Sequence, residues 1–149
     1  MSELERDYAA EIAEGPERLR FALDMAKAGL HSMALGNGGA LIALFTLIGT
    51  GKVTLDMGVL WIAFACFALG TAATQAGYLL GFLSQNQFYM LSTQRAWNFS
   101  AQMDGKEPPH DEAAHFKAGY RWLYCGIASA LLSLASFIAG CVLALISVA

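Results

Sequence analysis

The side chains of this chain that could carry out acid–base or metal chemistry lie outside its long apolar stretches. The three histidines are His31, His110 and His115. The last two are five residues apart, not the four that place a metal-binding pair on one helix face. All twelve acidic residues also fall outside these stretches, although ionisable groups inside a membrane usually mark proton relays and ion-coupled transport. No phosphate-binding loop or nucleophile elbow occurs. We therefore predict that the protein is not an enzyme and holds no cofactor or metal.

The polar side chains that do lie within the apolar stretches are neutral. Thr71, Thr74, Gln75 and Tyr78 follow the spacing of one helix face, and Asn37 lies near the start of an earlier apolar stretch. Hydroxyl groups can bond to carbonyl groups of their own helix, but the amides of Asn37 and Gln75 need another helix, water or a lumen. We predict that these five residues line a pore or form polar contacts between helices.

Small residues at helical spacing form a second group. Glycine and alanine four residues apart let two membrane helices approach closely, which drives their association where lipid offers no hydrophobic force. Two uses are open: packing within the chain, and association with further copies. The residues that we assign to helix packing are Gly38, Gly39, Gly70, Ala73, Gly77 and Gly81.

The elements that must position these residues are membrane helices. Three stretches, 32–50, 57–83 and 124–148, approach or exceed the ~20 apolar residues that a bilayer needs. Hydrophobic residues make up 56% of the chain and charged residues only 14%, against about 25% charged in a typical soluble domain. We predict an all-α membrane protein with three transmembrane helices. Its three cysteines, Cys66, Cys125 and Cys141, lie in apolar surroundings, so we expect buried thiols.

The basic residues predict the orientation of the chain in the membrane. Of the nine Lys and Arg residues, only Lys52 lies in the turn between the first two spans. Lys and Arg accumulate in loops on the cytoplasmic side. The N-terminus and residues 84–123 are therefore expected in the cytoplasm, with the C-terminus outside.

The segments outside the membrane are also expected to be helical. Residues 2–14 predict a short N-terminal amphipathic helix, which the Gly-Pro pair at 15–16 should end. Residues 17–31 then extend the first span into the cytoplasm. The second span should continue unbroken to about residue 103, and Pro109 should begin the helix that leads into the third span. Residues 84–123 thus form a cytoplasmic helical hairpin, and residues 1–149 form a single domain.

One segment carries a resemblance to a known family. Residues 37–49 read NGGALIALFTLIG and follow a charged cytoplasmic helix. This arrangement resembles small multi-span bacterial membrane proteins of anti-phage defence cassettes, the Hailong-type membrane effectors among them. The resemblance implies an oligomer that is held closed until a cytoplasmic signal triggers membrane disruption. It brings no binding motif that can be assigned to residues of this chain.

These observations leave two hypotheses for the function. Three spans in a small chain enclose no cavity of their own, so a polar face is most useful at a symmetric interface between copies. The first hypothesis is a homo-oligomeric inner-membrane pore or channel-like effector, gated by its cytoplasmic helices and acting in anti-phage defence. Its partners would be membrane lipid, further copies of the chain, and a cytoplasmic protein or signal ligand. The alternative is a non-conducting membrane anchor or accessory subunit that docks a cytoplasmic partner protein.

Overall fold

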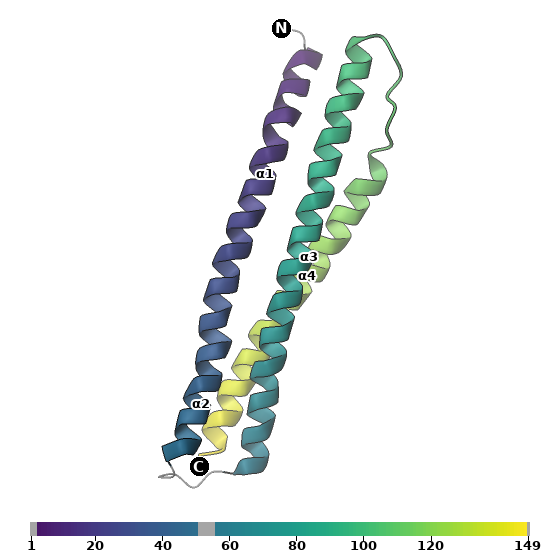
Figure 1. Cartoon of the computed structure of the whole chain (residues 1–149). Coiled ribbons are helices and arrows are strands. Elements are labelled where there is room, and N and C mark those ends of the chain that lie inside the picture. The colour runs from purple at the N-terminus through teal and green to yellow at the C-terminus, as the bar shows by residue number, and fades with distance from the viewer. Residues whose placement is uncertain (1–2, 51–55, 149) are drawn as a thin grey trace. The chain divides into compact units, whose positions relative to one another are not determined.

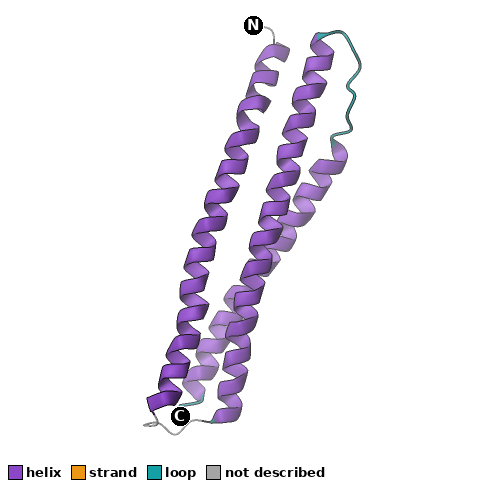
Figure 2. Cartoon of the chain, viewed as in Figure 1, coloured by secondary structure: helices purple, strands orange, loops and turns teal. Residues whose placement is uncertain are grey.

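The computed structural model of the chain describes residues 3–50 and 56–148. These residues form helices joined by short connections and contain no strand (Figures 1 and 2). The predicted all-α class is confirmed. In chain order the elements are α1 (Glu3–Met33), a π-helical turn η1 (Ala34–Gly38), α2 (Gly39–Thr50), α3 (Met57–Met103) and α4 (Ala113–Ile146).

Helices α3 and α4 are each long and apolar enough to cross a membrane. In the most apolar 18-residue segment of each helix, only 33% (α3) and 17% (α4) is buried inside the protein. Large apolar side chains such as Trp61 and Leu131 are more than 60% exposed. The buried residues, by contrast, include as many polar side chains as apolar ones, among them Ser84 and Ser133. Small and polar residues at helix contacts, with large apolar residues exposed, are typical of helices that pack in lipid.

The second predicted span continues as one unbroken helix, as expected. Helix α3 has 47 residues and is therefore about 70 Å long at 1.5 Å per residue. The hydrocarbon core of a bilayer is about 30 Å thick, so more than half of α3 extends beyond any span that it makes. No proline occurs within it, and its C-terminal half supplies one arm of the predicted hairpin.

The predicted helix break at Gly15-Pro16 is wrong. Helix α1 runs through Pro16 without interruption, so there is no separate N-terminal helix; Ser2, the first residue of the predicted one, lies outside the described residues. Proline costs a helix interior one hydrogen bond, but its fixed φ is itself helical. Gly15 is buried, and a Cβ there would lie 3.5 Å from the Tyr89 ring of α3. Gly15 therefore packs against α3 at the position of the predicted break.

The first predicted span is interrupted. Residues 32–50 are divided among the end of α1, the π-helical turn and α2, which has only 12 residues. The apolar stretch Leu35–Gly49 has 15 residues, fewer than the ~20 that a helix needs to cross a bilayer. A π-turn adds one residue to a helical turn and frequently occurs at functional sites. It falls on the Gly-Asn-Gly sequence, whose glycines tolerate the altered backbone.

Helix α4 begins at Ala113, four residues later than predicted from Pro109, and ends at Ile146. Two residues before its start, Asp111 accepts a hydrogen bond from the Ala113 amide at 2.9 Å. Asn98 of α3 holds the connection in place: its side-chain nitrogen donates to the His110 carbonyl and its oxygen accepts from the His110 amide, both at 3.0 Å. These side-chain bonds hold residues 110–112 in an irregular conformation before the helix begins.

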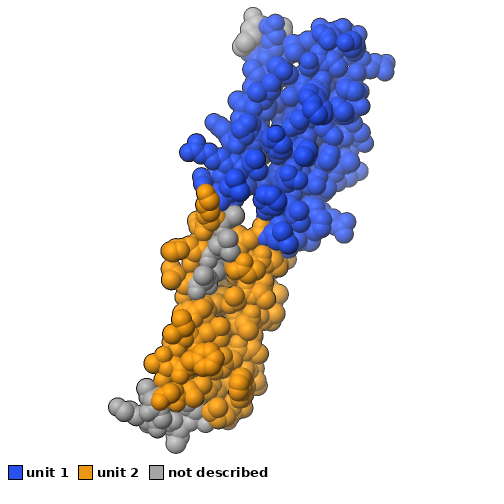
Figure 3. All heavy atoms as spheres, viewed as in Figure 1, with its two compact units in different colours: residues 1–26, 79–125 blue, residues 27–78, 126–149 orange. Residues whose placement is uncertain are grey.

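The chain divides into two compact units, coloured in Figure 3. Unit 1 comprises residues 1–26 and 79–125, and unit 2 comprises residues 27–78 and 126–149. The apolar core of unit 2 is built from Leu44 of α2 with Leu60 and Phe67 of α3. The polar contacts of unit 1 are described below. Each unit contains part of α1, α3 and α4, and the single domain stays a prediction.

Candidate functional site

The contact between α3 and α4 in unit 2 is made by small residues. A Cβ added at Gly77 would lie 3.4 Å from the Ser129 Cβ and 3.5 Å from the Gly126 carbonyl oxygen. Farther along, a Cβ at Gly140 would come within 2.9 Å of the Phe67 ring. At Gly77 the helices are therefore in ordinary contact, whereas at Gly140 the Phe67 ring occupies the space that a side chain would need.

A buried polar cluster lies at this contact. The hydroxyls of Thr74 and Ser133 are 2.7 Å apart, and both residues are almost fully buried. The Thr74 hydroxyl also donates to the Gly70 carbonyl of its own helix at 2.9 Å. The two hydroxyls form a hydrogen bond between the helices in which either oxygen can be the donor. In hydrocarbon such a bond is worth about 0.6–2 kcal/mol.

Asn37 reaches the same cluster from the π-helical turn. It is only 3% exposed, and its Oδ1 has no hydrogen-bond partner among the described residues. A Cβ built at Gly70 would lie 3.0 Å from this oxygen and 3.3 Å from the Ser133 carbonyl oxygen, so three helical segments meet at Gly70. Leaving a buried acceptor unpaired costs about 1–3 kcal/mol, so the Asn37 oxygen destabilises this junction unless it gains a partner.

The other predicted polar residues are not brought into this cluster. Thr71 donates to the Phe67 carbonyl of its own helix at 2.9 Å. Tyr78 lies over Gly29 of α1, where an added Cβ would come 1.2 Å from its hydroxyl oxygen. Gln75 is exposed on the outer side of α3. The five residues therefore do not form one lining; two are buried near Gly70, and Gln75 faces away from the chain.

The small residues also separate into two groups. Gly70, Ala73 and Gly77 are buried or close to other helices within the chain. A Cβ at Gly38, Gly39 or Gly81 would meet no described atom within 4 Å. These last three glycines have no close neighbour among the described residues, and their assignment to helix packing stays a prediction. Periodicity placed Gly70, Ala73, Gly77 and Gly81 on one face, but it does not say which side of that face a neighbouring helix occupies.

A second polar network, which the sequence did not single out, lies in unit 1. In unit 1, Arg95 of α3 bonds to Glu112 through Nε at 3.0 Å and to Glu11 of α1 through Nη1 at 3.4 Å. Asn98 donates to the other Glu112 oxygen at 2.9 Å. Burial lowers the pKa of Arg95, but its hydrogen bonds and the two negative charges outweigh burial and raise the pKa above its ordinary value. Arg95 therefore stays charged and joins α1, α3 and the start of α4.

Ser84 is a second residue that sequence reasoning missed. Its side chain is fully buried, and its hydroxyl donates to the Gly119 carbonyl of α4 at 2.9 Å. A Cβ at Gly119 would lie 2.8 Å from the Phe88 ring, so this is another place of close approach. A serine next to a run of polar residues gives no signal that separates it from an exposed one. The predicted burial of Cys125 is wrong, because that side chain is exposed.

Comparison with protein-family models, curated proteins and solved structures finds no match to this chain. The fold and the site alone define its class: an all-helical protein with two helices that can cross a membrane and a buried polar cluster where they meet. Within the part of the chain that the structure describes, no three His, Cys, Asp or Glu side chains gather as a metal site would require.

Proposed function

We propose that the protein crosses the bacterial inner membrane three times, with the N-terminus in the cytoplasm, and that α2 with its π-helical turn is the first span. Leu44 of α2 packs on Leu60 and Phe67, which lie in the apolar part of α3. On its other side α2 exposes Ile42 and Phe45, each by more than 60%. A short helix that shares an apolar core with α3 and exposes large apolar side chains is most stable at the same depth in lipid.

We further propose that the chain forms a homo-oligomer through the outer side of α3. The observation that carries this proposal is Gln75, an amide exposed within the apolar part of that helix. Small exposed residues lie around it at helical spacing: Ala65, Ala68, Ala72 and Ala76. An amide in hydrocarbon needs a partner, and it is both donor and acceptor. The same residue of a neighbouring copy can therefore satisfy it around a symmetry axis.

A ring of Gln75 amides would give a polar path through the membrane, so the function best supported by the geometry is a pore or channel-like effector. The cytoplasmic parts of the helices would gate this path, because α3 and α4 run without a break from one region into the other. The resemblance of residues 37–49 to defence-cassette membrane proteins favours membrane disruption in anti-phage defence as the biological outcome.

A non-conducting anchor that docks a cytoplasmic protein is the second candidate. The observation that favours it is the number of large apolar side chains exposed in unit 1. Phe21, Met25 and Trp97 are each more than half exposed. Exposed apolar patches of this kind commonly mark interaction sites. An anchor would use the same oligomer but would leave the membrane tight.

Purified protein in liposomes distinguishes these functions. The pore hypothesis predicts release of an entrapped small dye by the wild-type protein, and a change in release for Gln75→Leu with folding retained. Gln102→Leu removes an exposed amide outside the apolar part of α3 and should release dye as the wild type does. Tight liposomes containing oligomeric protein would refute the pore and support the anchor. A monomer in both mild detergent and liposomes would refute self-association.

A further inference from the structure

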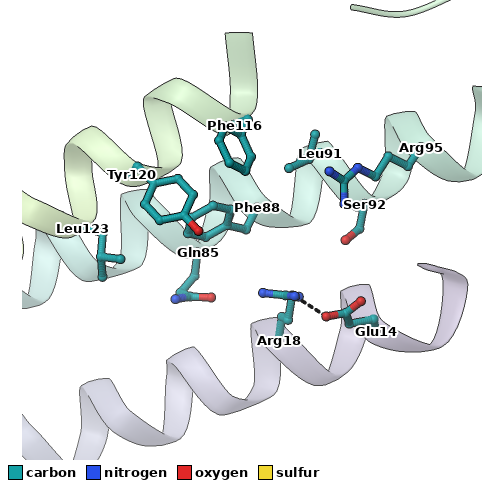
Figure 4. Close-up of a pocket in the computed structure, with 10 residues that line it drawn as sticks. All are labelled: Glu14, Arg18, Gln85, Phe88, Leu91, Ser92, Arg95, Phe116, Tyr120 and Leu123. Carbon is teal, nitrogen blue, oxygen red and sulfur yellow. Dashed lines mark hydrogen bonds and ion pairs between the residues drawn. The ribbon is translucent and has the colours of Figure 1, made fainter. Parts of the chain in front are cut away.

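Unit 1 contains a cavity of about 330 Å³ between α1, α3 and α4 (Figure 4). Ligand pockets typically start at about this volume and combine apolar walls with a few polar groups. The cavity fits that description, because aromatic and leucine side chains line one part of it and polar or charged side chains line the other. The lining residues are Glu14, Arg18, Gln85, Phe88, Leu91, Ser92, Arg95, Phe116, Tyr120 and Leu123.

The apolar wall is an ordered aromatic surface. The rings of Phe88 and Tyr120 meet edge to face with centroids 5.4 Å apart, and those of Phe116 and Tyr120 are 4.8 Å apart. Along α3, Gln85 follows the apolar stretch by two residues; along α4, Leu123 directly precedes Tyr124, where the other apolar stretch begins. The cavity therefore lies where each of these helices changes from apolar to polar. In the proposed membrane placement, this is the level of the lipid headgroups.

The charges that line the cavity are paired rather than predominantly positive. Arg18 and Glu14 form an ion pair one helical turn apart on α1, with side chains 44% and 46% exposed. Exposed pairs of this kind are weak, so each partner can exchange the other for a ligand. Arg95 is already held by Glu11 and Glu112, and acidic residues outnumber basic ones in unit 1. A purely anionic ligand would leave Glu14 facing a second negative charge.

We propose that this cavity binds the zwitterionic headgroup of an ethanolamine phospholipid. The lipid phosphate accepts from the guanidinium of Arg18, with the Ser92 hydroxyl and the Gln85 amide as further donors at the cavity wall. The primary ammonium donates to the carboxylate of Glu14. The glycerol and the first acyl carbons then rest on Tyr120 and Leu123. Binding replaces the Arg18–Glu14 ion pair with two ion pairs to the ligand, one between Arg18 and the phosphate and one between Glu14 and the ammonium. No charge is then left uncompensated.

This chemistry distinguishes ethanolamine lipid from the other common headgroups. A choline group carries the same charge but has no N–H to donate to Glu14. A glycerol headgroup leaves the lipid with a net negative charge and gives Glu14 no cation. Losing one charge-assisted hydrogen bond corresponds to a factor of about ten in affinity. We expect ethanolamine lipid to bind about tenfold more tightly than either competitor.

The test measures lipid binding to the full chain in detergent by native mass spectrometry, titrated with ethanolamine, choline and glycerol phospholipids of identical acyl chains. The wild type should prefer the ethanolamine lipid, and Arg18→Gln and Glu14→Gln should each reduce that preference to about threefold or less. Arg20→Gln and Glu17→Gln change exposed residues of the same helix that do not line the cavity, and should keep the preference. Circular dichroism verifies that all four variants remain helical.

Three results would overturn the proposal: equal binding of the three lipids, tighter binding of the anionic glycerol lipid, or soluble phosphoethanolamine binding as tightly as the lipid. The last result would assign the cavity to a free metabolite-sized ligand. The proposal rests on the membrane placement above but not on the pore. Flotation of the protein with liposomes separates the two: failure to float refutes the membrane placement, whereas flotation without lipid preference refutes only the headgroup site.

Discussion

Replacing Gly70 with alanine tests whether three helical segments meet at the buried polar cluster. The new methyl group would lie 3.0 Å from Oδ1 of Asn37 and 3.3 Å from the Ser133 carbonyl oxygen. Both distances are shorter than ordinary carbon–oxygen contacts. The carbonyl belongs to the α4 backbone and cannot move alone, and Asn37 is 97% buried by the residues around it, since only 3% of it is exposed. Gly70→Ala must therefore push α4 and the π-helical turn away from α3.

The magnitude follows from two opposing effects. Alanine favours a helix interior over glycine by about 1 kcal/mol, whereas overpacking a tight contact costs about 1–3 kcal/mol. Gly77 is the matched control on the same helix, because a Cβ there would make only ordinary contacts at 3.4 and 3.5 Å. Gly77→Ala should thus be neutral or stabilising. We expect Gly70→Ala to be less stable than Gly77→Ala by about 1–3 kcal/mol.

The measurement is unfolding of the purified protein in mild detergent by added dodecyl sulfate, followed by tryptophan fluorescence. The same measurement in the Asn37→Ala background removes the atom nearest to the new methyl group. The destabilisation caused by Gly70→Ala should therefore fall there by about half. Equal stability of Gly70→Ala and Gly77→Ala would refute the meeting of the three segments. An unchanged cost in the Asn37→Ala background would refute the contribution of Asn37 to it.

Three further predictions test other contacts. Gly29→Ala would place a methyl group 1.2 Å from the Tyr78 hydroxyl, so it should destabilise the protein by about 1–3 kcal/mol, and Tyr78→Ala should restore stability in the double variant; a neutral Gly29→Ala alone would refute that contact. Asn98→Ala removes both hydrogen bonds to the backbone of His110, so hydrogen exchange of the His110 amide should quicken about tenfold or more, and an unchanged rate would refute this role of Asn98. Cys125 is exposed while the other two cysteines are half-buried, so maleimide in detergent should label it first; equal labelling rates would contradict this assignment.

The helical architecture was largely predictable because the strongest signals in the sequence are local. Helix α3 was expected to continue to about residue 103, since no proline interrupts it, and it ends at Met103. The break predicted at Pro16 failed: α1 is continuous there, and Gly15 packs on Tyr89 of α3, a residue that is distant in sequence. The late start of α4 at Ala113 depends on Asn98, a residue distant in sequence. No local pattern reveals such contacts.

The site was predictable in its residue types but not in its arrangement. The amide of Asn37 was expected to need a partner, and the structure places it at the junction near Gly70 with its oxygen still unpaired. The π-helical turn that carries it has no signal beyond the neighbouring glycines. Helical spacing grouped Thr74 and Gln75 on one face, yet one is buried against Ser133 and the other is exposed. Two neighbouring positions on a helix differ in burial when the edge of an interhelical contact lies between them.

The proposed function depends most on the exposed amide of Gln75. The most direct measurement is the number of copies per particle, by single-molecule photobleaching of labelled protein in liposomes, together with dye release from the same liposomes. We predict oligomeric wild-type particles that release dye, with both properties changed in Gln75→Leu and unchanged in Gln102→Leu. Single copies per particle, or a Gln75→Leu variant with the same copy number and the same release as the wild type, would contradict it.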